Sequence, residues 1–355
     1  MSAASAGRWT PAGGRSLRVG LAGLGSMGLN HLRLLAGRSD LRLVAVSDPV
    51  ATSLEAAVGR SAAQGYSSPL TMLDEADLDA IVVAAPTTAH LEIALAAIEA
   101  GVAVLVEKPL AATTAEARRI VDASRASGVP VQVGHVERFN PAVLELGRLL
   151  ELGWLSTIYS ISSRRAGPFP ARIRDVGVTI DLATHDVDIL SWIAGERPRR
   201  VYAETAQRIH ADHEDLLFGL LSFPSGATGF LDVNWLSPTK RRQLVVVGEE
   251  GMFELDYLTQ RLTFTKQANL EHPTFIGGYA PTFQGDVADL PVTSGEPLAA
   301  ELEAFVRVVR EGTRPIVDAE DGLWAVAIAD SLLESARTAQ VREIGGVADE
   351  SLAPR

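Results

Sequence analysis

Hydrophobic residues in the first part of the chain form short unbroken runs, and segments with helical spacing separate these runs. The runs that we predict as strands are Leu17–Ala22, Leu41–Ser47, Asp79–Ala85, Val102–Leu110 and Val131–Gly134. Continuous Val, Leu, Ile and Ala runs are typical of strands that are covered on both faces. Between them lie segments with helical spacing: Met27–Leu35, a segment that ends at Ala100, and about Thr114–Ser127. This alternation predicts an α/β domain with a doubly wound parallel (Rossmann) sheet.

Beyond residue 136 the pattern changes to strands that are joined by turn residues, such as Pro224-Ser225-Gly226. The strands expected here are Thr157–Arg165, a strand from Val201, Leu216–Phe223, Thr228–Trp235, Arg242–Gly248, Met252–Tyr257 and Leu262–Lys266. Helices are expected at about Thr179–Ile193, Pro297–Arg310 and Asp321–Thr338. We predict an α+β domain with a large, mostly antiparallel open sheet and helices on one face. Residues 267–296 carry few periodic signals and receive no assignment.

These patterns divide the chain into three parts. Residues 1–15 are expected to form a disordered leader, because they hold small residues and arginines without an apolar core. Residues 16–136 form the predicted dinucleotide-binding domain, and residues 137–355 form a domain for substrate binding and oligomerisation. The last helix, at about 321–338, is expected to pack back on the first domain.

Composition narrows the class of protein. Of 355 residues, 47% are hydrophobic and 21% charged, which is typical of a globular core. The net charge of -12 argues against nucleic acid or an anionic membrane as partner, and no apolar run is long enough for a membrane span. With no cysteine, thiolate chemistry is excluded. We expect a cytoplasmic protein with a small-molecule substrate and no metal. An exposed sheet face would favour a homo-dimer or homo-tetramer.

A glycine-rich turn follows the first predicted strand directly. Gly23, Gly25 and Gly28 form a GxGxxG pattern, with Ser26 and Met27 opening the next helix. Glycines there permit a tight turn, a close approach of the backbone to a pyrophosphate, and close packing of the helix on the strand. The free N–H groups of the helix N-terminus then hold the anion. The turn predicts a dinucleotide site.

The second strand ends at Asp48, twenty residues beyond Gly28. A carboxylate at this place accepts hydrogen bonds from the ribose hydroxyls and repels a 2′-phosphate. No arginine follows within the next ten positions, since Arg60 comes later. These features favour NAD over NADP as the cofactor. Alternatively, Asp48-Pro49 is an ordinary turn at a strand end.

The run Val102–Leu110 ends in Glu107-Lys108-Pro109. Pro109 stops the strand, so Lys108 lies at the carboxyl end of a parallel strand, where open α/β sheets bind ligands. The chain has only three lysines (Lys108, Lys240 and Lys266), which favours a chemical role for this one. Alternatively, Glu107 and Lys108 are a solvated pair at a strand end.

The helix predicted at 179–193 carries Asp181 and His185, four residues apart and therefore on one face, which Asp188 continues. A carboxylate beside an imidazole is a general-base arrangement. Two alternatives remain open. In one, the acidic residues stabilise the helix dipole and the histidine is solvated. The other is a metal site, for which no third ligand is evident. Four arginines precede this helix: Arg164, Arg165, Arg172 and Arg174. Guanidinium groups are suited to bind phosphate or carboxylate. Alternatively, these arginines simply lie at the surface.

The three motifs together resemble the glucose–fructose oxidoreductase/inositol dehydrogenase (Gfo/Idh/MocA) family, from Leu17 to about Val341. In that family, the lysine of Glu-Lys-Pro and the Asp and His of the later helix act on a sugar or cyclitol hydroxyl. The resemblance implies Lys108, Asp181 and His185 as catalytic residues. It implies further cofactor contacts from Pro86, Thr87, His90, Glu107 and Lys108. Implied substrate contacts are Glu137, Arg138, Asn140, Arg165, Arg172, Asp181 and Trp235.

Two stretches, 134–143 and 167–189, look most like the branch of the family that acts on nucleotide sugars, with UDP-N-acetylglucosamine oxidised at C3 as the implied substrate. We therefore expect an NAD-dependent dehydrogenase that oxidises a secondary hydroxyl by reversible hydride transfer. Two alternatives stay open. One is a reductase of a cyclitol, an imine or a conjugated double bond, and the other is a non-catalytic dinucleotide-binding sensor.

Overall fold

A computed structural model describes residues 9–170, 176–267, 274–276, 280–282 and 285–345. The chain divides into two compact units, each of which combines segments that are distant in sequence. Unit 1 contains the chain up to Val136 together with Leu298–Val326, and unit 2 contains Glu137–Pro297 and the chain from Ala327. Among the described residues, no helix has both the length and the apolar character that crossing a membrane requires.

Unit 1 is built on a six-stranded sheet in which every strand pairing is parallel. In spatial order its strands are β3 (Gln64–Tyr66), β2 (Leu41–Ser47), β1 (Leu17–Ala22), β4 (Ala80–Val83), β5 (Ala103–Glu107) and β6 (Val131–Gly134). This order reverses between β1 and β4 and is that of doubly wound dinucleotide-binding folds. The predicted Rossmann sheet is confirmed.

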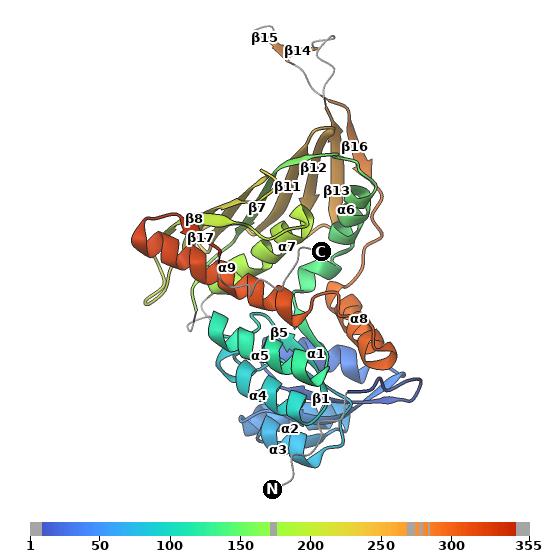
Figure 1. The fold of residues 1–355 in the computed structure, drawn as a ribbon. Coiled ribbons are helices and arrows are strands. Elements are labelled where there is room, and N and C mark those ends of the chain that lie inside the picture. Colours follow the sequence, from blue (N-terminus) through green and yellow to red (C-terminus); the bar gives the residue numbers. More distant parts are fainter. Residues whose placement is uncertain (1–8, 171–175, 268–273, 277–279, 283–284, 346–355) are drawn as a thin grey trace. The chain divides into compact units, whose positions relative to one another are not determined.

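Helices flank this sheet (Figure 1). They are α1 (Ser26–Ala36), α2 (Ala51–Ser61), α3 (Pro69–Glu75), α4 (Thr87–Glu99), α5 (Thr114–Ser127) and α8 (Pro297–Glu311). Helix α8 comes from the distant C-terminal part of the chain, which the sequence analysis assigned to the second domain. That assignment is wrong for α8, because Leu302, Phe305, Val306 and Val309 are buried in one core cluster with residues of β1 and α1.

The leader prediction is wrong for residues 9–13. The backbone N–H groups of Ala12 and Gly13 donate to carbonyl oxygens of Val309 and Arg310, at 2.9 and 3.1 Å. Trp9 and Ala12 also pack against the core cluster of unit 1. The short segment therefore has enough apolar surface to lie ordered along α8.

Unit 2 contains a nine-stranded sheet, which confirms the predicted α+β architecture. In spatial order its strands are β16 (Val287–Leu290), β13 (Arg261–Lys266), β12 (Gly251–Asp256), β11 (Arg241–Gly248), β7 (Ile158–Ala166), β10 (Thr228–Asn234), β9 (Leu216–Ser222), β8 (Arg200–Ala206) and β17 (Arg342–Glu343). All pairings are antiparallel except that of β7 with β10, at the centre. A separate hairpin joins β14 (Thr274–Ile276) and β15 (Ala280–Thr282), within the stretch that received no assignment.

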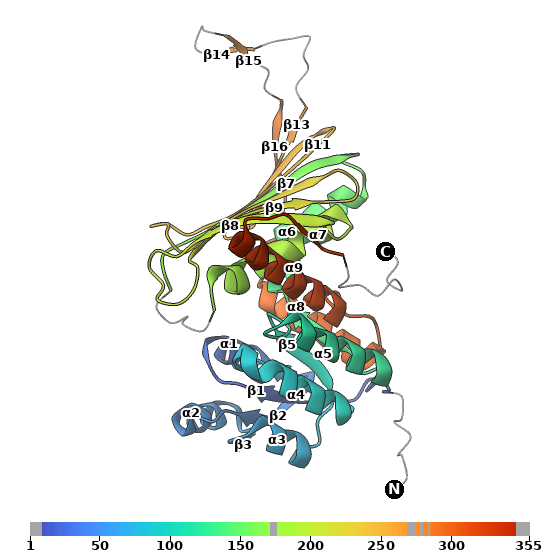
Figure 2. The same ribbon diagram turned by 60° about the vertical axis from the view of Figure 1, so that its left-hand side comes forward.

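Helices cover one face of this sheet, as Figures 1 and 2 show for α6 (Pro141–Glu151), α7 (Thr184–Ala194) and the C-terminal part of α9 (Ala319–Thr338). Strands β7, β9 and β10 alternate buried and exposed residues along much of their length, so side chains on the opposite face reach solvent. Short turns precede α6 and α7: a 3₁₀ turn at Val136–Phe139 and a π-helical turn at Thr179–Ala183.

Candidate functional site

The glycine-rich turn between β1 and α1 has the steric features of a dinucleotide loop. Gly23 has a φ of +91°, and a Cβ there would lie 2.5 Å from the carbonyl oxygen of Ala84. A Cβ at Gly28 would lie 2.0 Å from the carbonyl oxygen of Gly23. A Cβ at Gly25 would meet nothing within 4 Å. Two glycines are thus required by the fold itself, and Gly25 leaves the backbone open to a ligand.

The N-terminus of α1 begins beside this opening. Gly25 is its N-cap and provides no side-chain cap, so the first N–H groups of the helix, at Ser26 and Met27, are available to a pyrophosphate. Asp48 follows β2 and lies against the loop, because its Oδ2 accepts a hydrogen bond of 2.7 Å from the N–H of Leu24. Its Oδ1 accepts from Val50 at 2.8 Å. These residues fit NAD: an open backbone, a helix N-terminus and a carboxylate for the ribose.

The ends of β4 and β5 carry the other predicted cofactor residues. Pro86 is the N-cap of α4, which begins at Thr87. The ring nitrogens of His90 lie 3.0 Å from the carbonyl oxygen of Ala85 and 2.8 Å from that of Pro109. Burial lowers the pKa of His90. The ring lies between the two strand-end loops, and in its neutral form it can donate to only one of the two carbonyl oxygens. Its geometry supports a bracing role, and direct contact with the cofactor stays a prediction.

Glu107 and Lys108 have different surroundings at the end of β5. The carboxylate of Glu107 lies 2.8 Å from Nε2 of His31, within the interior of unit 1. Lys108 is half-buried and is the first residue beyond the strand. Sequence analysis predicted cofactor contact for both residues. The structure places the Glu107 side chain on a histidine of α1, which the sequence analysis did not consider.

In unit 2, two buried ion pairs fix α7. Arg165 of β7 donates from Nε to Asp186 at 2.8 Å and from Nη1 to Glu137 at 3.0 Å. Arg138 contacts Asp188 through Nε at 2.7 Å and Nη2 at 2.9 Å. Buried pairs that satisfy several donors hold elements in one orientation. The acidic residues at 186 and 188 therefore attach the helix to its neighbours.

Asp181 and His185 lie on the same stretch of chain as these anchors. Asp181 is in the π-helical turn and half-buried, whereas His185 is in the first turn of α7 with 9% of its surface exposed. The turn begins where the carboxylate of Glu214 accepts a hydrogen bond of 3.0 Å from the N–H of Thr179. A π-helical turn has more residues than an α-helical one, so the simple four-residue spacing of the prediction does not describe this segment.

The predicted arginine cluster is divided by the sheet. Arg164 and Arg165 are consecutive on β7 and point to opposite faces. Arg164 is exposed and pairs with Asp232 at 3.0 Å, so it lies on the other face of the sheet from Arg165. Arg172 and Arg174 lie outside the described residues.

Two further predicted substrate residues have structural partners. Asn140 is the N-cap of α6, and its Nδ2 donates to the carbonyl oxygen of Tyr257 at 3.1 Å. Trp235 is buried, with ring centroids 5.9 Å from Phe169 and 6.2 Å from His210. Substrate contact by either residue stays a prediction.

Sequence reasoning missed Arg242. This residue lies directly opposite Arg165 in the β7–β11 pairing. Burial and the neighbouring charge of Arg165 lower the pKa of Arg242 to about 10, although Asp186, Glu137 and Asp181 oppose this shift. A half-buried guanidinium close to Asp181 is a further candidate for substrate contact. Its only sequence signal was a pair of arginines at the start of a strand.

The doubly wound sheet, the open glycine turn and the strand-end carboxylate together define an NAD-binding oxidoreductase domain. Residues 17–135 match the oxidoreductase family with an NAD-binding Rossmann fold, and residues 143–254 match the GFO/IDH/MocA C-terminal domain. The chain belongs to the Gfo/Idh/MocA family of oxidoreductases. The predicted family, fold class, enzyme class and NAD cofactor are confirmed.

Known relatives extend over nearly the whole chain. Inositol 2-dehydrogenase 2 of Saccharopolyspora erythraea is 31% identical over 96% of this chain and 97% of its own. UDP-N-acetylglucosamine 3-dehydrogenase GnnA from Acidithiobacillus ferrooxidans shares the fold, with a TM-score of 0.81, 23% identity, and coverage of 91% and 98%. The WlbA dehydrogenase from Bordetella pertussis, solved with NADH and UDP-GlcNAcA, gives a TM-score of 0.78, 25% identity, and coverage of 93% and 99%.

Proposed function

We propose that this oxidoreductase oxidises a secondary hydroxyl on the ring of a sugar or nucleotide sugar, in a reversible reaction. The Gly-rich turn with Asp48, the strand-end Lys108 and the α7 segment with Asp181 and His185 support the proposal. When it is bound, NAD supplies the hydride acceptor. The protein supplies the groups that bind the substrate and move its proton.

In this proposal His185 is the general base. The hydroxyl gives its proton to the imidazole as the carbon that bears it loses a hydride. Lys108 donates a hydrogen bond to the same oxygen as it becomes a carbonyl, and Asp181 orients the imidazole. In the reverse direction, the protonated imidazole returns the proton and the ketone is reduced.

The observation that carries the proposal is that the polar residues of the α7 segment fall into two groups with different surroundings. Asp186 and Asp188 are committed to buried arginines and hold the helix in place. Asp181 and His185 lie at its start, where Asp181 is half-buried and 9% of the His185 surface is exposed. A rigid helix that presents an acid and an imidazole at one end is suited to proton transfer.

The relatives favour two substrate classes. The full-length relative named as an inositol 2-dehydrogenase favours a cyclitol as the second candidate. The WlbA complex contains a UDP-linked sugar and favours a nucleotide sugar for this chain too. Arg242 of β11, which is half-buried, adds a donor of the kind that binds phosphate or carboxylate.

The test is an assay of NADH formation with a panel of free sugars, inositols and UDP-sugars, with excess NAD. We expect turnover of at least one ring alcohol, and its class identifies the substrate. A protein that binds NAD but oxidises none of the panel would contradict the dehydrogenase proposal. In that case the same panel of NADH oxidations with imines and conjugated carbonyls tests the reductase alternative.

We also propose that the uncovered face of the nine-stranded sheet joins copies of this chain into a homo-oligomer. Phe218, Leu220 and Phe230 lie on this face with 42%, 45% and 39% of their surfaces exposed. The rings of Phe218 and Phe230 stack with centroids 6.5 Å apart. Adjacent exposed aromatic residues on an uncovered sheet face are typical of a protein interface.

A further inference from the structure

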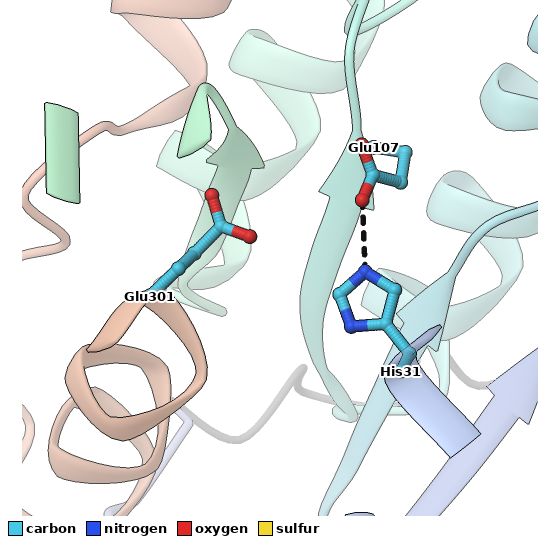
Figure 3. Close-up of side chains that lie close together, drawn as sticks. All are labelled: His31, Glu107 and Glu301. Carbon is cyan, nitrogen blue, oxygen red and sulfur yellow. Dashed lines mark hydrogen bonds and ion pairs between the residues drawn. The ribbon is translucent and has the colours of Figure 1, made fainter. Parts of the chain in front are cut away.

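Side chains from neighbouring elements support the residues of the proposed site in both units. In unit 1, Nε2 of the buried His31 lies 2.8 Å from the carboxylate of Glu107, the residue before Lys108 (Figure 3). In unit 2, Glu214 contacts the backbone of the π-helical turn that leads to the start of α7. This second contact acts on the segment that carries the proposed general base.

Glu214 lies near the end of the loop between β8 and β9, and a buried aspartate holds this loop in shape. Asp215 is 0% exposed, and its Oδ2 accepts hydrogen bonds from the three backbone N–H groups of residues 208–210. The N–H of Asp215 donates to the carbonyl oxygen of Ala206 at 3.0 Å, and its own carbonyl accepts from Trp235 at 2.9 Å. Because residue 215 is held by side chain and backbone, Glu214 has a fixed place beside it.

Glu214 satisfies two donors at the start of the π-helical turn. Its carbonyl oxygen accepts from the N–H of Val178 and its Oε1 from that of Thr179, both at 3.0 Å. The first N–H groups of a helix have no acceptor within the helix, and the side chain of Val178, the N-cap, offers none. The N–H of Asp181 then donates to the carbonyl oxygen of Gly177 at 3.0 Å. Glu214 therefore takes the role of an N-cap side chain from a distant part of the chain.

A glycine makes room for this contact. A Cβ at Gly177 would overlap the carboxylate of Glu214, so the carboxylate occupies the space that a side chain at 177 would take. The carboxylate is the end of a flexible side chain. We therefore expect Gly177→Ala to displace it from Thr179, which gives a second, independent way to break the contact.

We propose that Glu214 is a positioning residue, whose carboxylate fixes the turn that carries Asp181 and leads to His185. The buried ion pairs at residues 186 and 188 anchor α7 beyond its first turn, and Glu214 anchors the segment before it. The effect of Glu214 on catalysis rests on the proposed function, whereas its contact with the turn does not.

Hydrogen exchange measures this contact without any substrate. In Glu214→Ala the backbone amides of residues 178–183 should exchange about tenfold faster than in the wild type, because an acceptor at the helix end is lost. Glu214→Gln keeps an acceptor oxygen and should stay within about twofold of the wild type. Asp212→Ala removes an exposed carboxylate from the same loop and should leave these rates unchanged.

Activity tests the positioning. With the substrate from the panel assay, Glu214→Ala should lower kcat on the order of tenfold, because a displaced acid and imidazole no longer align with the hydroxyl. Glu214→Gln should restore most of this loss, and the Kd for NAD should be unchanged in both variants. Gly177→Ala should lower kcat by a similar factor. In the Glu214→Ala background it should cost nothing further, because both substitutions break the same contact.

Wild-type exchange rates in Glu214→Ala would overturn the contact itself. Faster exchange with a wild-type kcat would overturn the positioning role, as would losses in kcat that multiply in the double variant. If the wild type oxidises no member of the panel, the dehydrogenase proposal fails, while the exchange rates still decide whether Glu214 holds the turn.

Discussion

Asp48 connects cofactor choice to the glycine turn, because one of its oxygens accepts from Leu24 inside that turn. Its negative charge should repel a 2′-phosphate, so the unmodified protein should bind NAD more tightly than NADP. Asp48→Asn should narrow the ratio of the two Kd values by about tenfold, or about 1.4 kcal/mol. Calorimetric titration with both cofactors measures this ratio. Asp77→Asn, an exposed charge change in the same unit, is the control, and wild-type protein that prefers NADP would contradict the prediction.

Lys108 is the residue whose removal should separate chemistry from cofactor binding. Lys108→Ala should lower kcat on the order of a hundredfold, because a positioned donor to the developing charge is lost. The Kd for NAD should change little, since the Gly-rich turn remains intact. Lys240→Ala, at an exposed position of unit 2, should leave both values unchanged. Normal turnover by Lys108→Ala would mean that Lys108 is only a solvated charge at a strand end.

The contacts of a single residue could be predicted from sequence where a motif determines the local chemistry. They were harder to predict where partners from distant parts of the chain determine them. Gly23 and Gly28 have the close contacts that the GxGxxG pattern implies. Arg138 and Arg165 were expected to contact the substrate, yet their guanidinium groups bind Asp188 and Asp186. A sequence shows that an arginine is present but not which carboxylate the fold brings to it.

At the scale of elements, short apolar runs between turn residues gave accurate boundaries. Strands β1, β2 and β6 and helix α5 begin and end as expected, because Gly, Pro or Asp punctuates each run. Helices α2, α3 and α6 were not assigned, and the parallel pairing of β7 with β10 could not be foreseen. Hairpin signals indicate only that neighbours in sequence pair, so they contain no information on a strand that joins from a distance.

Helix α8 provides a test at this scale, since it completes the core of unit 1 from a distant part of the chain. Phe305→Ala should lower the free energy of unfolding by about 3–5 kcal/mol, because it removes a large buried ring and leaves a cavity. Urea unfolding measures the loss. Arg307→Ala lies on the exposed side of the same helix and should cost far less. Similar losses in the two variants would mean that α8 does not pack as described.

For the whole molecule, the family and the two types of sheet were predictable from sequence, because each has its own hydrophobic period. The division of the chain into two units was harder to predict from sequence. Residues 298–326 belong to unit 1 although they follow residues 137–297 of unit 2 in the sequence. The sequence pattern of α8 is that of an amphipathic helix and does not indicate which sheet the helix covers. Long-range packing of this kind depends on where the chain returns, which local patterns do not specify.

The proposed oligomer is also a property of the whole molecule. Phe218→Asp combined with Phe230→Asp should produce smaller species in analytical ultracentrifugation, because two charges would have to be buried in the interface. The thermal unfolding of the isolated chain should change little, since both side chains are exposed. Glu254→Gln, an exposed substitution on β12, is the control. A wild-type protein that sediments as a monomer at micromolar concentration would contradict the interface.

The central claim is that His185 takes the proton from a ring hydroxyl, and the pH profile of alcohol oxidation tests it most directly. A neutral imidazole is needed, so kcat should rise with pH along an acid limb in the neutral range. His185→Ala should lose most activity together with this limb, Asp181→Asn should lose less, and His213→Asn should keep the wild-type profile. The measurement is the initial rate of NADH formation from pH 5 to 10 with NAD in excess. A His185→Ala protein with the wild-type rate and the wild-type limb would contradict the account.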